Sequence, residues 1–327
     1  MPIILTRNDL RELLPMGEVI SALEEAFQAY AQGKTVVPVR LPLEVKPYKG
    51  ISLFMPAFQE EPDGLGVKVV SVFPENVKKK LPTIFSYYLF CDPQTGALLG
   101  LMDGSILTGL RTGAASGLAS RYLARKDSKT LGIFGAGFQA GFQFEAMMAV
   151  LPSLEKALVF DFDRGRVSDF IKSLARVGKI EIRQAADPDE VVKESDVIVT
   201  ATTSQTPAFR GKLLKPGTHI NAIGGFTPAM QEVDEETVLR SKVVVDTYEG
   251  CLAEAGELLI PMKRGMFSKE QIHSDLGGLA SGTKPGRVDP KEITLFKSVG
   301  TALEDLAPAR LAYQKALKKG MGLSFDL

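Results

Sequence analysis

The stretch Lys129-Thr-Leu-Gly-Ile-Phe-Gly-Ala-Gly-Phe-Gln-Ala-Gly141 decides the fold of this 327-residue chain. Its apolar run from Thr130 to Phe134 is typical of a strand buried in a parallel sheet. A helical pattern then begins at Phe138 and continues to about Val150. The stretch therefore predicts a strand, a tight turn and a helix in direct succession.

The turn between this strand and this helix carries the spacing of a dinucleotide-binding fingerprint, Gly135-x-Gly137-x-x-Ala140. Gly135 allows a tight turn, and Gly137 lets the main chain approach a pyrophosphate at the N-terminus of the helix. A glycine-rich turn alone is also compatible with plain helix–strand packing. However, a second strand ends at Asp161, where an acid accepts bonds from a ribose hydroxyl. Together they predict a nicotinamide-type cofactor.

The residues after Asp161 continue the alternation of helices and strands. Helices are expected at about Gly165–Val177, Pro188–Glu194 and Glu235–Arg240, and strands at Ile180–Gln184, Asp196–Thr200, Thr218–Gly224, Lys242–Asp246 and Ile293–Phe296. This order predicts an α/β fold with a Rossmann-type doubly wound parallel sheet. Its ligand crevice should lie at the carboxyl ends of the strands, lined by Gly135–Gln139, Thr200–Thr203 and Ile223–Thr227. The Gly- and Ser-rich segment Gly277–Gly286 is expected to be a loop.

The first hundred residues follow a different pattern, with two short helices and then several consecutive strands, the first at Val36–Val45. This pattern predicts a separate mixed α+β domain. We place it at residues 1–125, completed by a C-terminal helix at about 302–327, and place the dinucleotide-binding domain at 126–301. The last helix is expected to begin at Val299.

Composition narrows the class of protein. Lys and Arg together number 39, as do Asp and Glu, so no excess of positive charge favours nucleic acid or an anionic membrane. The N-terminus lacks the pattern of a secretory signal, and two cysteines are too few for a disulfide framework. These features favour a cytoplasmic location and no membrane span. The two histidines and two cysteines are spaced too irregularly to predict a metal site, and His219, inside an apolar strand, is interpreted as structural.

Three basic residues interrupt apolar stretches in the part of the chain that lacks the fingerprint. They are Arg40, Lys68 and Arg111. Each alone is compatible with an edge position or a structural ion pair, but together they indicate a pocket for an anion. Arginine offers a planar fork to a carboxylate, and a lysine whose pKa is lowered by burial can donate a proton.

Several segments give the chain a resemblance to the ornithine cyclodeaminase/mu-crystallin family. They are Gly66-Val-Lys-Val-Val-Ser, Leu107-Thr-Gly-Leu-Arg-Thr-Gly-Ala-Ala-Ser-Gly, Gly135-Ala-Gly-Phe-Gln-Ala, His219-Ile-Asn-Ala-Ile-Gly-Gly and Glu292-Ile-Thr-Leu-Phe-Lys-Ser-Val-Gly. The resemblance implies a homodimer, with the N-terminal substrate-binding domain and the last helix forming the subunit interface. It also implies that Arg40, Lys68 and Arg111 hold a substrate carboxylate. We take Lys68 as the catalytic residue, because Lys68 or a bound water would supply the proton to the substrate nitrogen.

Resemblance and fingerprint together give one set of expected cofactor contacts. By resemblance, Thr112 contacts a cofactor phosphate, and Asn221, Val299 and Gly300 lie near the nicotinamide. The full expected set is Thr112, Gly135, Gly137, Phe138, Gln139, Asp161, Thr200, Ala201, Thr202, Asn221, Ile223, Val299 and Gly300. Asp161 favours NAD(H), because a carboxylate repels a 2′-phosphate, whereas Arg164 and Arg166 keep NADP(H) possible.

Two positions depart from the cyclodeaminases of the family. Phe226 stands where cyclodeaminases and the alanine dehydrogenase carry an aspartate, and Leu53 stands where cyclodeaminases tend to carry a glutamate. Both residues are expected to line the substrate pocket. The leading hypothesis is an NAD(P)-dependent reductase of a small cyclic imino acid such as pyrroline-2-carboxylate. The alternatives are ornithine cyclodeamination, alanine dehydrogenation, and non-catalytic binding like that of mu-crystallin.

Overall fold

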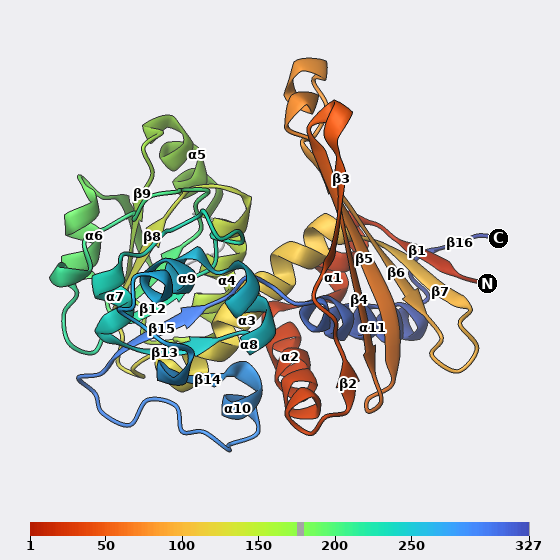
Figure 1. Cartoon of the computed structure of the whole chain (residues 1–327). Helices are drawn as coiled ribbons and strands as arrows, with labels where there is room; N and C mark the ends of the chain where they lie inside the picture. Colours follow the sequence, from red (N-terminus) through yellow and green to blue (C-terminus); the bar gives the residue numbers. More distant parts are fainter. Residues whose placement is uncertain (175–179, 327) are drawn as a thin grey trace. The chain divides into compact units, whose positions relative to one another are not determined.

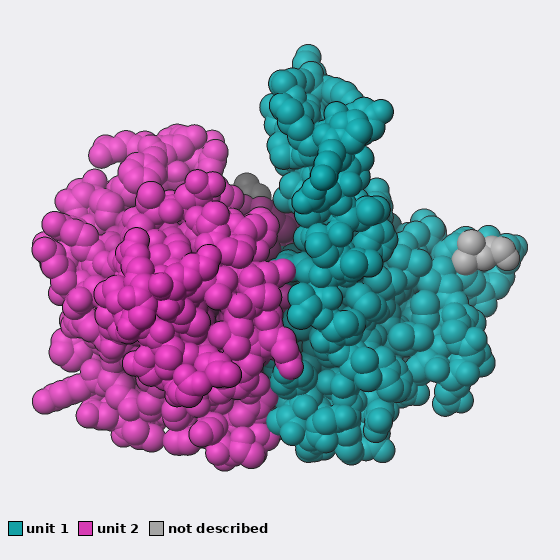
Figure 2. All heavy atoms as spheres, viewed as in Figure 1, with its two compact units in different colours: residues 1–111, 301–327 teal, residues 112–300 magenta. Residues whose placement is uncertain are grey.

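The computed structural model describes residues 1–174 and 180–326, and its chain forms two compact units (Figure 1). Unit 1 comprises Met1–Arg111 and Thr301–Leu327, and unit 2 comprises Thr112–Gly300 (Figure 2). Helix α3 (Gly104–Leu123) contains the division at Arg111, whereas the sequence analysis placed it after Arg125.

Unit 1 is built on a mostly antiparallel sheet. Its strands lie in the order β16-β1-β7-β6-β5-β4-β2, with β3 also paired to β4. The strands are β1 (Ile3–Leu5), β2 (Thr35–Val36), β3 (Leu41–Val45), β4 (Gly50–Gln59), β5 (Gly64–Val72), β6 (Ile84–Cys91), β7 (Leu98–Asp103) and β16 (Leu323–Ser324). Short 3-10 helices, η1 (Lys46–Tyr48) and η2 (Pro74–Lys79), lie in two of the connections.

Helices of unit 1 pack on this sheet. Helix α11 (Ala302–Lys319) contacts β4, β5, β6 and α2 (Met16–Ala31). Helix α1 (Arg7–Leu13) begins at Thr6, whose side chain accepts a hydrogen bond from the Asp9 amide in a capping box. The buried stripe of α2 includes Val19, Leu23 and Phe27, as its periodicity predicts. Unit 1 is therefore a mixed α+β unit completed by a helix from the far end of the chain.

Unit 2 confirms the predicted Rossmann-type doubly wound sheet. Its strands are all parallel, in the order β10-β9-β8-β11-β12-β15-β13-β14. They span β8 (Thr130–Phe134), β9 (Lys156–Phe160), β10 (Glu181–Gln184), β11 (Val197–Thr200), β12 (His219–Ala222), β13 (Ser241–Val245), β14 (Ile272–Asp275) and β15 (Ile293–Lys297). The strand order reverses between β8 and β11, and in such folds ligands bind at the carboxyl ends of the strands there.

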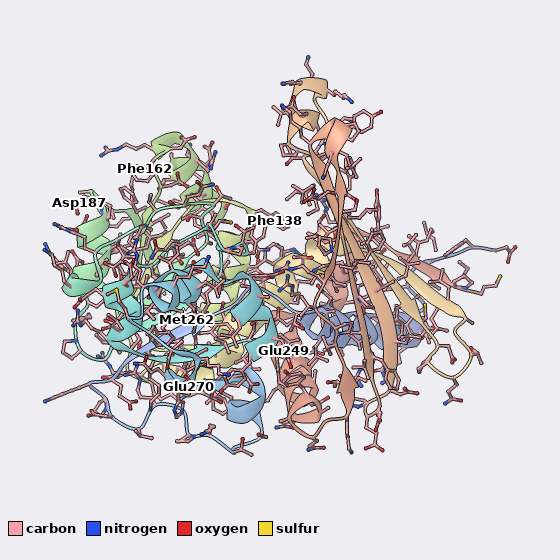
Figure 3. All side chains as sticks on the ribbon, in the orientation of Figure 1. Phe138, Phe162, Asp187, Glu249, Met262 and Glu270 are labelled. Carbon is pink, nitrogen blue, oxygen red and sulfur yellow. The ribbon has the colours of Figure 1, made fainter. Side chains whose placement is uncertain are left out.

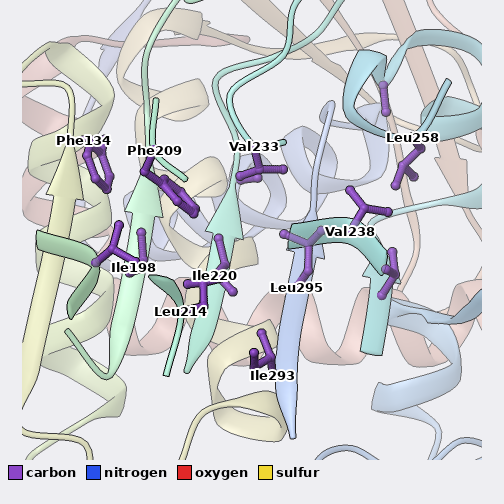
Figure 4. Close-up of a cluster of buried hydrophobic side chains, with 14 of the residues drawn as sticks. Phe134, Ile198, Phe209, Leu214, Ile220, Val233, Val238, Leu258, Ile293 and Leu295 are labelled. Atoms are coloured by element: carbon purple, nitrogen blue, oxygen red, sulfur yellow. The ribbon is translucent and has the colours of Figure 1, made fainter. Parts of the chain in front are cut away.

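Further helices of unit 2 follow the C-terminal part of α3. They are α4 (Phe138–Val150), α5 (Arg164–Leu174), α6 (Pro188–Glu194), α7 (Glu235–Leu239), α8 (Tyr248–Glu254), α9 (Gly256–Lys263) and α10 (Leu276–Ala280), with 3-10 turns η3 (Gly211–Leu213) and η4 (Lys269–Gln271). Buried side chains of the strands and helices form one apolar cluster that includes Phe134, Ile198, Ile220 and Leu295 (Figure 4). Because the β8, β11 and β12 strands are buried along their whole length, the turn that follows β8 has a rigid support.

Some expectations about individual elements were wrong. The segment 277–286 is not all loop, because the Asp275 side chain caps α10, which runs to Ala280. The strand expected at 36–45 is two strands, β2 and β3, separated by a segment that contains Pro38. The last helix begins at Ala302 rather than Val299, after Gly300 with a φ of +83°. The end of the helix expected at 165–177 lies outside the described residues.

Candidate active site

Lys68 lies in the middle of β5, on the face of the sheet that α11 covers. Its cross-strand neighbours are Met55 on β4 and Tyr88 on β6. Its ammonium group lies 2.9 and 2.7 Å from the two carboxylate oxygens of Asp305, and it also donates to Thr108 Oγ1 at 3.3 Å. The residue is only 1% exposed. A buried cation therefore occupies a position that would suit an apolar side chain.

Arg111, on α3 at the end of the first segment of unit 1, contacts Asp305 and also its neighbour Glu304. One terminal nitrogen of its guanidinium donates to Glu304, and its Nε lies 3.3 Å from Asp305 Oδ1. Glu304 and Asp305 are fully buried in the first turn of α11, where the helix dipole favours negative charge. Lys68 and Arg111 are thus brought together by one turn of α11.

The surroundings of Lys68 change its acidity. Burial lowers the pKa of Lys68 from 10.5 to about 8; the Asp305 carboxylate opposes this shift, while the positive charges of Arg111 and Arg40 add to it. Arg40, half-buried just before β3, is therefore close enough to act on Lys68 electrostatically. The three basic residues of the sequence prediction form one group, together with two carboxylates.

The two apolar residues expected in the substrate pocket lie in different units. Leu53 is half-buried on β4, opposite Val70 of β5, and lies on the same face of the sheet as Met55. Phe226 belongs to unit 2, follows β12 after Gly225, and is 44% exposed. Neither side chain offers a group that accepts a proton.

The fingerprint turn of unit 2 has the shape that its glycines predict. Gly135 has a φ of +94°, and a Cβ placed there would lie 2.6 Å from the Ala201 carbonyl oxygen. Gly137 is the N-cap residue of α4, and a Cβ placed there would meet no described heavy atom within 4 Å. Phe138, labelled in Figure 3, is 55% exposed at the start of α4, whereas the Oε1 atom of Gln139 is buried.

Asp161 follows β9 and lies against the fingerprint turn. Its Oδ2 accepts a hydrogen bond from the Ala136 amide at 3.0 Å, and its Oδ1 accepts one from the Asp163 amide at 3.0 Å. Each carboxylate oxygen has a second lone pair, so the group keeps acceptor capacity. An open pocket beside Ala136 is lined by Asp163, Arg166 and other residues of α5. The acid thus lies where the fingerprint predicts it.

The two loops that follow β11 and β12 are joined through Glu232, which is fully buried. One of its carboxylate oxygens accepts from the Thr202 amide at 2.6 Å and the Thr202 hydroxyl at 2.8 Å. The other accepts from the Thr200 hydroxyl at 2.9 Å and the Gly224 amide at 2.6 Å. Burial raises the pKa of Glu232, although the Lys297 ammonium opposes the shift. This residue fixes the edge of unit 2 that carries several of the expected cofactor contacts.

Main-chain hydrogen bonds extend the sheet into these loops. The Ala201 amide donates to the Phe134 carbonyl at 2.9 Å, and the Ile223 amide donates to the Thr200 carbonyl at 3.1 Å. Thr200 and Ala201 therefore lie beside the end of β8, and Ile223 lies beside the end of β11.

The expected contacts after β15 are held by another acid, Asp246. Its Oδ2 accepts from the amides of Val299 and Gly300, at 2.8 and 2.7 Å. Lys297, at the end of β15, pairs with Glu257 at 3.1 Å and donates to the Gly225 carbonyl at 2.6 Å. The turn of Val299 and Gly300 is therefore fixed by Asp246, which directly follows β13.

Asn221 and Thr112, also expected near the cofactor, are buried in unit 2. The Asn221 side chain donates to Ser120 Oγ at 3.0 Å, and its Oδ1 lies 3.2 Å from His219 Nε2. The Thr112 carbonyl accepts from the Gln143 side chain at 3.1 Å. Burial lowers the pKa of His219 to about 3, so the imidazole is neutral and takes part in a network of buried side chains.

Sequence reasoning missed the acids that hold these groups. They are Glu232, Asp246, Glu257, Glu304 and Asp305, with Lys297 as a further buried cation. The signal that singled out Lys68, a charge within an apolar stretch, is also present in Leu303-Glu-Asp-Leu306 and in Leu295-Phe-Lys297. Glu232 and Asp246, in contrast, gave no signal, because acids outside strands and helices are common in exposed loops. Only the fold shows that these two are buried.

Two classes of site receive no support from the described residues. Within residues 1–174 and 180–326, no group of three or more His, Cys, Asp or Glu side chains is arranged to hold a metal ion. The same described part of the chain has no helix long and apolar enough to cross a membrane.

Known proteins are similar to this chain in both sequence and structure. The model of the ornithine cyclodeaminase/mu-crystallin family matches residues 1–320. A Delta(1)-pyrroline-2-carboxylate reductase of Bacillus cereus is 39% identical over 321 residues, which cover 98% of each chain. The structure of a Thermococcus litoralis Delta(1)-pyrroline-2-carboxylate reductase in complex with NADH and L-proline is similar with a TM-score of 0.95, at 45% identity, covering 99% of this chain and 100% of that one. An archaeal alanine dehydrogenase dimer with bound NAD is similar with a TM-score of 0.92, at 36% identity and 99% coverage of both chains.

Proposed function

The chain belongs to the ornithine cyclodeaminase/mu-crystallin family, and we propose that it is a nicotinamide-dependent reductase of a small cyclic imino acid, with pyrroline-2-carboxylate as its substrate. The observation that carries the proposal is Lys68, a buried ammonium with a lowered pKa beside Arg111. Such a group can bind a carboxylate and also give up a proton near neutral pH. The relative with NADH and L-proline bound supports the same substrate class.

In this proposal the residues of unit 1 bind and orient the substrate. The guanidinium of Arg111, with Lys68 and Arg40, receives the substrate carboxylate and so fixes the position of the C=N bond. A bound dihydronicotinamide supplies the hydride, which carries two electrons to the imine carbon. The Lys68 ammonium holds the proton that the ring nitrogen takes up, so that the C=N bond becomes CH–NH. Leu53, on the same face of the unit 1 sheet as Met55 and Lys68, forms an apolar wall that suits the ring carbons.

The residues of unit 2 fit a nicotinamide cofactor. Space beside the Gly137 Cα and the free N-terminus of α4 suit a pyrophosphate, and the buried Oε1 of Gln139 has no hydrogen-bond partner among the described residues. We assign Thr112, Gly135, Phe138, Thr200, Ala201, Thr202, Asn221, Ile223, Val299 and Gly300 to the rest of this site. Glu232 and Asp246 shape it by holding the loops.

Within this cofactor site we propose a preference for NAD(H), set by Asp161. Its carboxylate lies against the fingerprint turn, where it accepts bonds from ribose hydroxyls and repels a 2′-phosphate. We expect Asp161→Ala to raise the ratio of kcat/KM for NADPH to that for NADH at least tenfold. Glu236→Ala, which removes an exposed acid of α7 outside the pocket beside Ala136, is the control. An unchanged ratio in Asp161→Ala would mean that another residue, such as Arg166, decides the preference.

Phe226 separates this proposal from the cyclodeaminase and dehydrogenase alternatives. A phenyl ring can neither accept a proton nor orient an ammonium group, so ornithine and alanine lack a partner for their amines there. Steady-state assays of NADH oxidation with pyrroline-2-carboxylate or piperideine-2-carboxylate test the proposal. Ammonia release from ornithine, or NAD reduction by alanine with no turnover of either imino acid, would contradict it. Tight nucleotide binding without any turnover would indicate a binding protein instead.

We further propose that the chain forms a dimer through unit 1. Leu41 and Leu43 on β3 and Tyr87 on β6 point to the sheet face opposite Lys68, and all three are at least half exposed. An exposed apolar face of this kind marks an interaction site, and the alanine dehydrogenase of similar structure is a dimer. Light scattering should give twice the chain mass, and Leu41→Lys with Leu43→Lys should give monomers. Leu239→Lys, at an exposed leucine of unit 2, serves as the control.

A further inference from the structure

Asp305 is the residue of unit 1 through which Lys68 and Arg111 are joined. Both of its oxygens lie within 2.9 Å of the Lys68 ammonium, and Oδ1 is 3.3 Å from Arg111 Nε. Asp305 is fully buried and comes from α11, almost at the other end of the chain from β5. Glu304, the residue before it, contacts Arg111.

We propose that Asp305 is a positioning residue for the reductase reaction: it holds the Lys68 ammonium and the Arg111 guanidinium in place for the substrate carboxylate and keeps Lys68 protonated. The inference rests on the proposed function for the identity of the substrate. It adds a residue that touches neither substrate nor cofactor and acts through Lys68 and Arg111.

The directions of the Lys68 hydrogen bonds support this role. An ammonium has three N–H donors. Asp305 and Thr108 accept from Lys68 on the α11 and α3 sides, which leaves one donor for a ligand. Lys68 is 1% exposed between its cross-strand neighbours Met55 and Tyr88, so it has little room to turn this donor. Asp305 therefore decides where the remaining proton points.

The charges around Lys68 support the second part of the proposal. The titratable and charged groups that face it are Asp305 and Glu304 of α11, Arg111 of α3, Arg40 before β3, and Tyr88 of β6. Two of these are cations, and both favour the neutral amine, as does burial. Asp305 is the carboxylate in direct contact with the ammonium. Without its charge, Lys68 would lose its proton at a lower pH.

A purely structural role explains the cluster less well. Replacing a buried ion pair by apolar side chains of similar size is often neutral or stabilising, so such a cluster is weak support for stability. Val67 and Val69 flank Lys68 in β5, and Leu306 and Ala307 follow Asp305 in α11. An apolar pair would complete both faces. The charged pair is better explained by a role in binding or catalysis.

Three variants separate the two parts of the proposal. Asp305→Asn removes the negative charge that faces both Lys68 and Arg111. Glu304→Gln removes a negative charge that faces Arg111 and leaves the contact between Asp305 and Lys68 in place. Glu18→Gln is the control, because Glu18 of α2 forms an exposed ion pair with Lys315 of α11. The measurements are kcat and KM for pyrroline-2-carboxylate across pH, and binding of pyrrole-2-carboxylate, a planar carboxylate of the same ring size, by calorimetry.

We expect Asp305→Asn to move the alkaline limb of kcat/KM to lower pH by about one unit or more and to lower kcat about 10- to 100-fold. Glu304→Gln should raise KM and weaken pyrrole-2-carboxylate binding while its alkaline limb stays in place. Glu18→Gln should behave like the wild type. An unmoved limb in an active Asp305→Asn enzyme would overturn the proposal, and so would an unchanged kcat.

Loss of folding must not be mistaken for loss of positioning. Binding of NADH to unit 2 and the circular dichroism spectrum report whether each variant is folded. If Asp305→Asn does not fold, Asp305→Glu keeps the charge but moves it by one methylene. It should retain the wild-type limb with a lower kcat, and a shifted limb would contradict the proposal. A wild type without turnover would overturn the proposed function alone, because pyrrole-2-carboxylate binding still tests the positioning by Asp305.

Discussion

The two units bury ionised side chains in different ways. In unit 1 the acids of α11 hold other side chains, the ammonium of Lys68 and the guanidinium of Arg111. In unit 2 the acids Glu232 and Asp246 accept hydrogen bonds mainly from main-chain amides of loops. Apart from the buried Lys297–Glu257 pair of unit 2, unit 1 thus pairs its buried charges with one another, whereas unit 2 uses buried carboxylates to hold the backbone of loops. A substrate site built from side chains should fail through loss of chemistry, and a cofactor site built from backbone through loss of shape.

The largest effect should come from removing the buried positive charge of Lys68 in unit 1. We expect Lys68→Met to lower kcat for the imino acid by about 100- to 10,000-fold, because both the proton and part of the carboxylate site are lost. NADH affinity should stay within about threefold, since Lys68 belongs to unit 1. Stopped-flow and fluorescence titration measure the two quantities. Lys315→Met, at the exposed pair on α11, is the control. Equal losses of both properties would erase the distinction between the units.

Unit 2 should instead lose stability when its loop-holding carboxylate is changed. The Glu232 carboxylate accepts hydrogen bonds from the Thr202 and Gly224 amides. A glutamine at this position would turn its own NH₂ donor toward one of these amides and leave that amide unpaired. We expect Glu232→Gln to lower the free energy of unfolding by about 3 kcal/mol and to weaken NADH binding. Urea unfolding measures the first effect. Glu236→Gln, an exposed acid on α7, should change it by less than about 0.5 kcal/mol. A stable Glu232→Gln protein with weak NADH binding would show that Glu232 contacts the cofactor directly.

The two glycines of the fingerprint should fail in different ways. Gly135→Ala places a methyl group 2.6 Å from the Ala201 carbonyl in a backbone with a φ of +94°, so it should cost about 2 kcal/mol of stability. Gly137→Ala has open space around it and should leave stability within about 0.5 kcal/mol of the wild type. Its methyl group would nevertheless stand where a pyrophosphate approaches, so NADH affinity should fall about tenfold. Unchanged NADH affinity in Gly137→Ala would place the pyrophosphate elsewhere.

The smallest effect concerns pH and distinguishes the Lys68 group from the rest of the molecule. Because burial lowers the pKa of Lys68 to about 8, kcat/KM should fall as pH rises through that value. The unfolded chain keeps this proton up to pH 10.5, so it binds more protons than the folded chain between the two values. The contribution of Lys68 to stability should therefore rise with pH as activity falls. The difference between wild type and Lys68→Met in pH-dependent urea unfolding isolates this contribution. A difference that decreases with pH would contradict the assignment.

The local pattern alone determined much of unit 2. The β8 strand lies at the predicted Thr130–Phe134, α4 begins at the predicted Phe138, and Asp161 lies against the fingerprint turn. A parallel strand, a glycine turn and a helix N-terminus are set by neighbours in sequence, so spacing is sufficient to predict them. The family could also be predicted from the sequence alone, because each segment that carries the resemblance is an unbroken run of neighbouring residues.

Tertiary structure decided the partners of the charged residues. The sequence singled out Lys68 and Arg111 because charge is costly in apolar surroundings, but it offered no means of pairing them with Asp305. That pairing depends on α11 packing across β4, β5 and β6, a contact between opposite ends of the chain. Glu232 likewise became important only once the β11 and β12 loops were side by side. Spacing along the chain predicts local geometry, whereas the neutralisation of a buried charge depends on which distant segments the fold brings into contact.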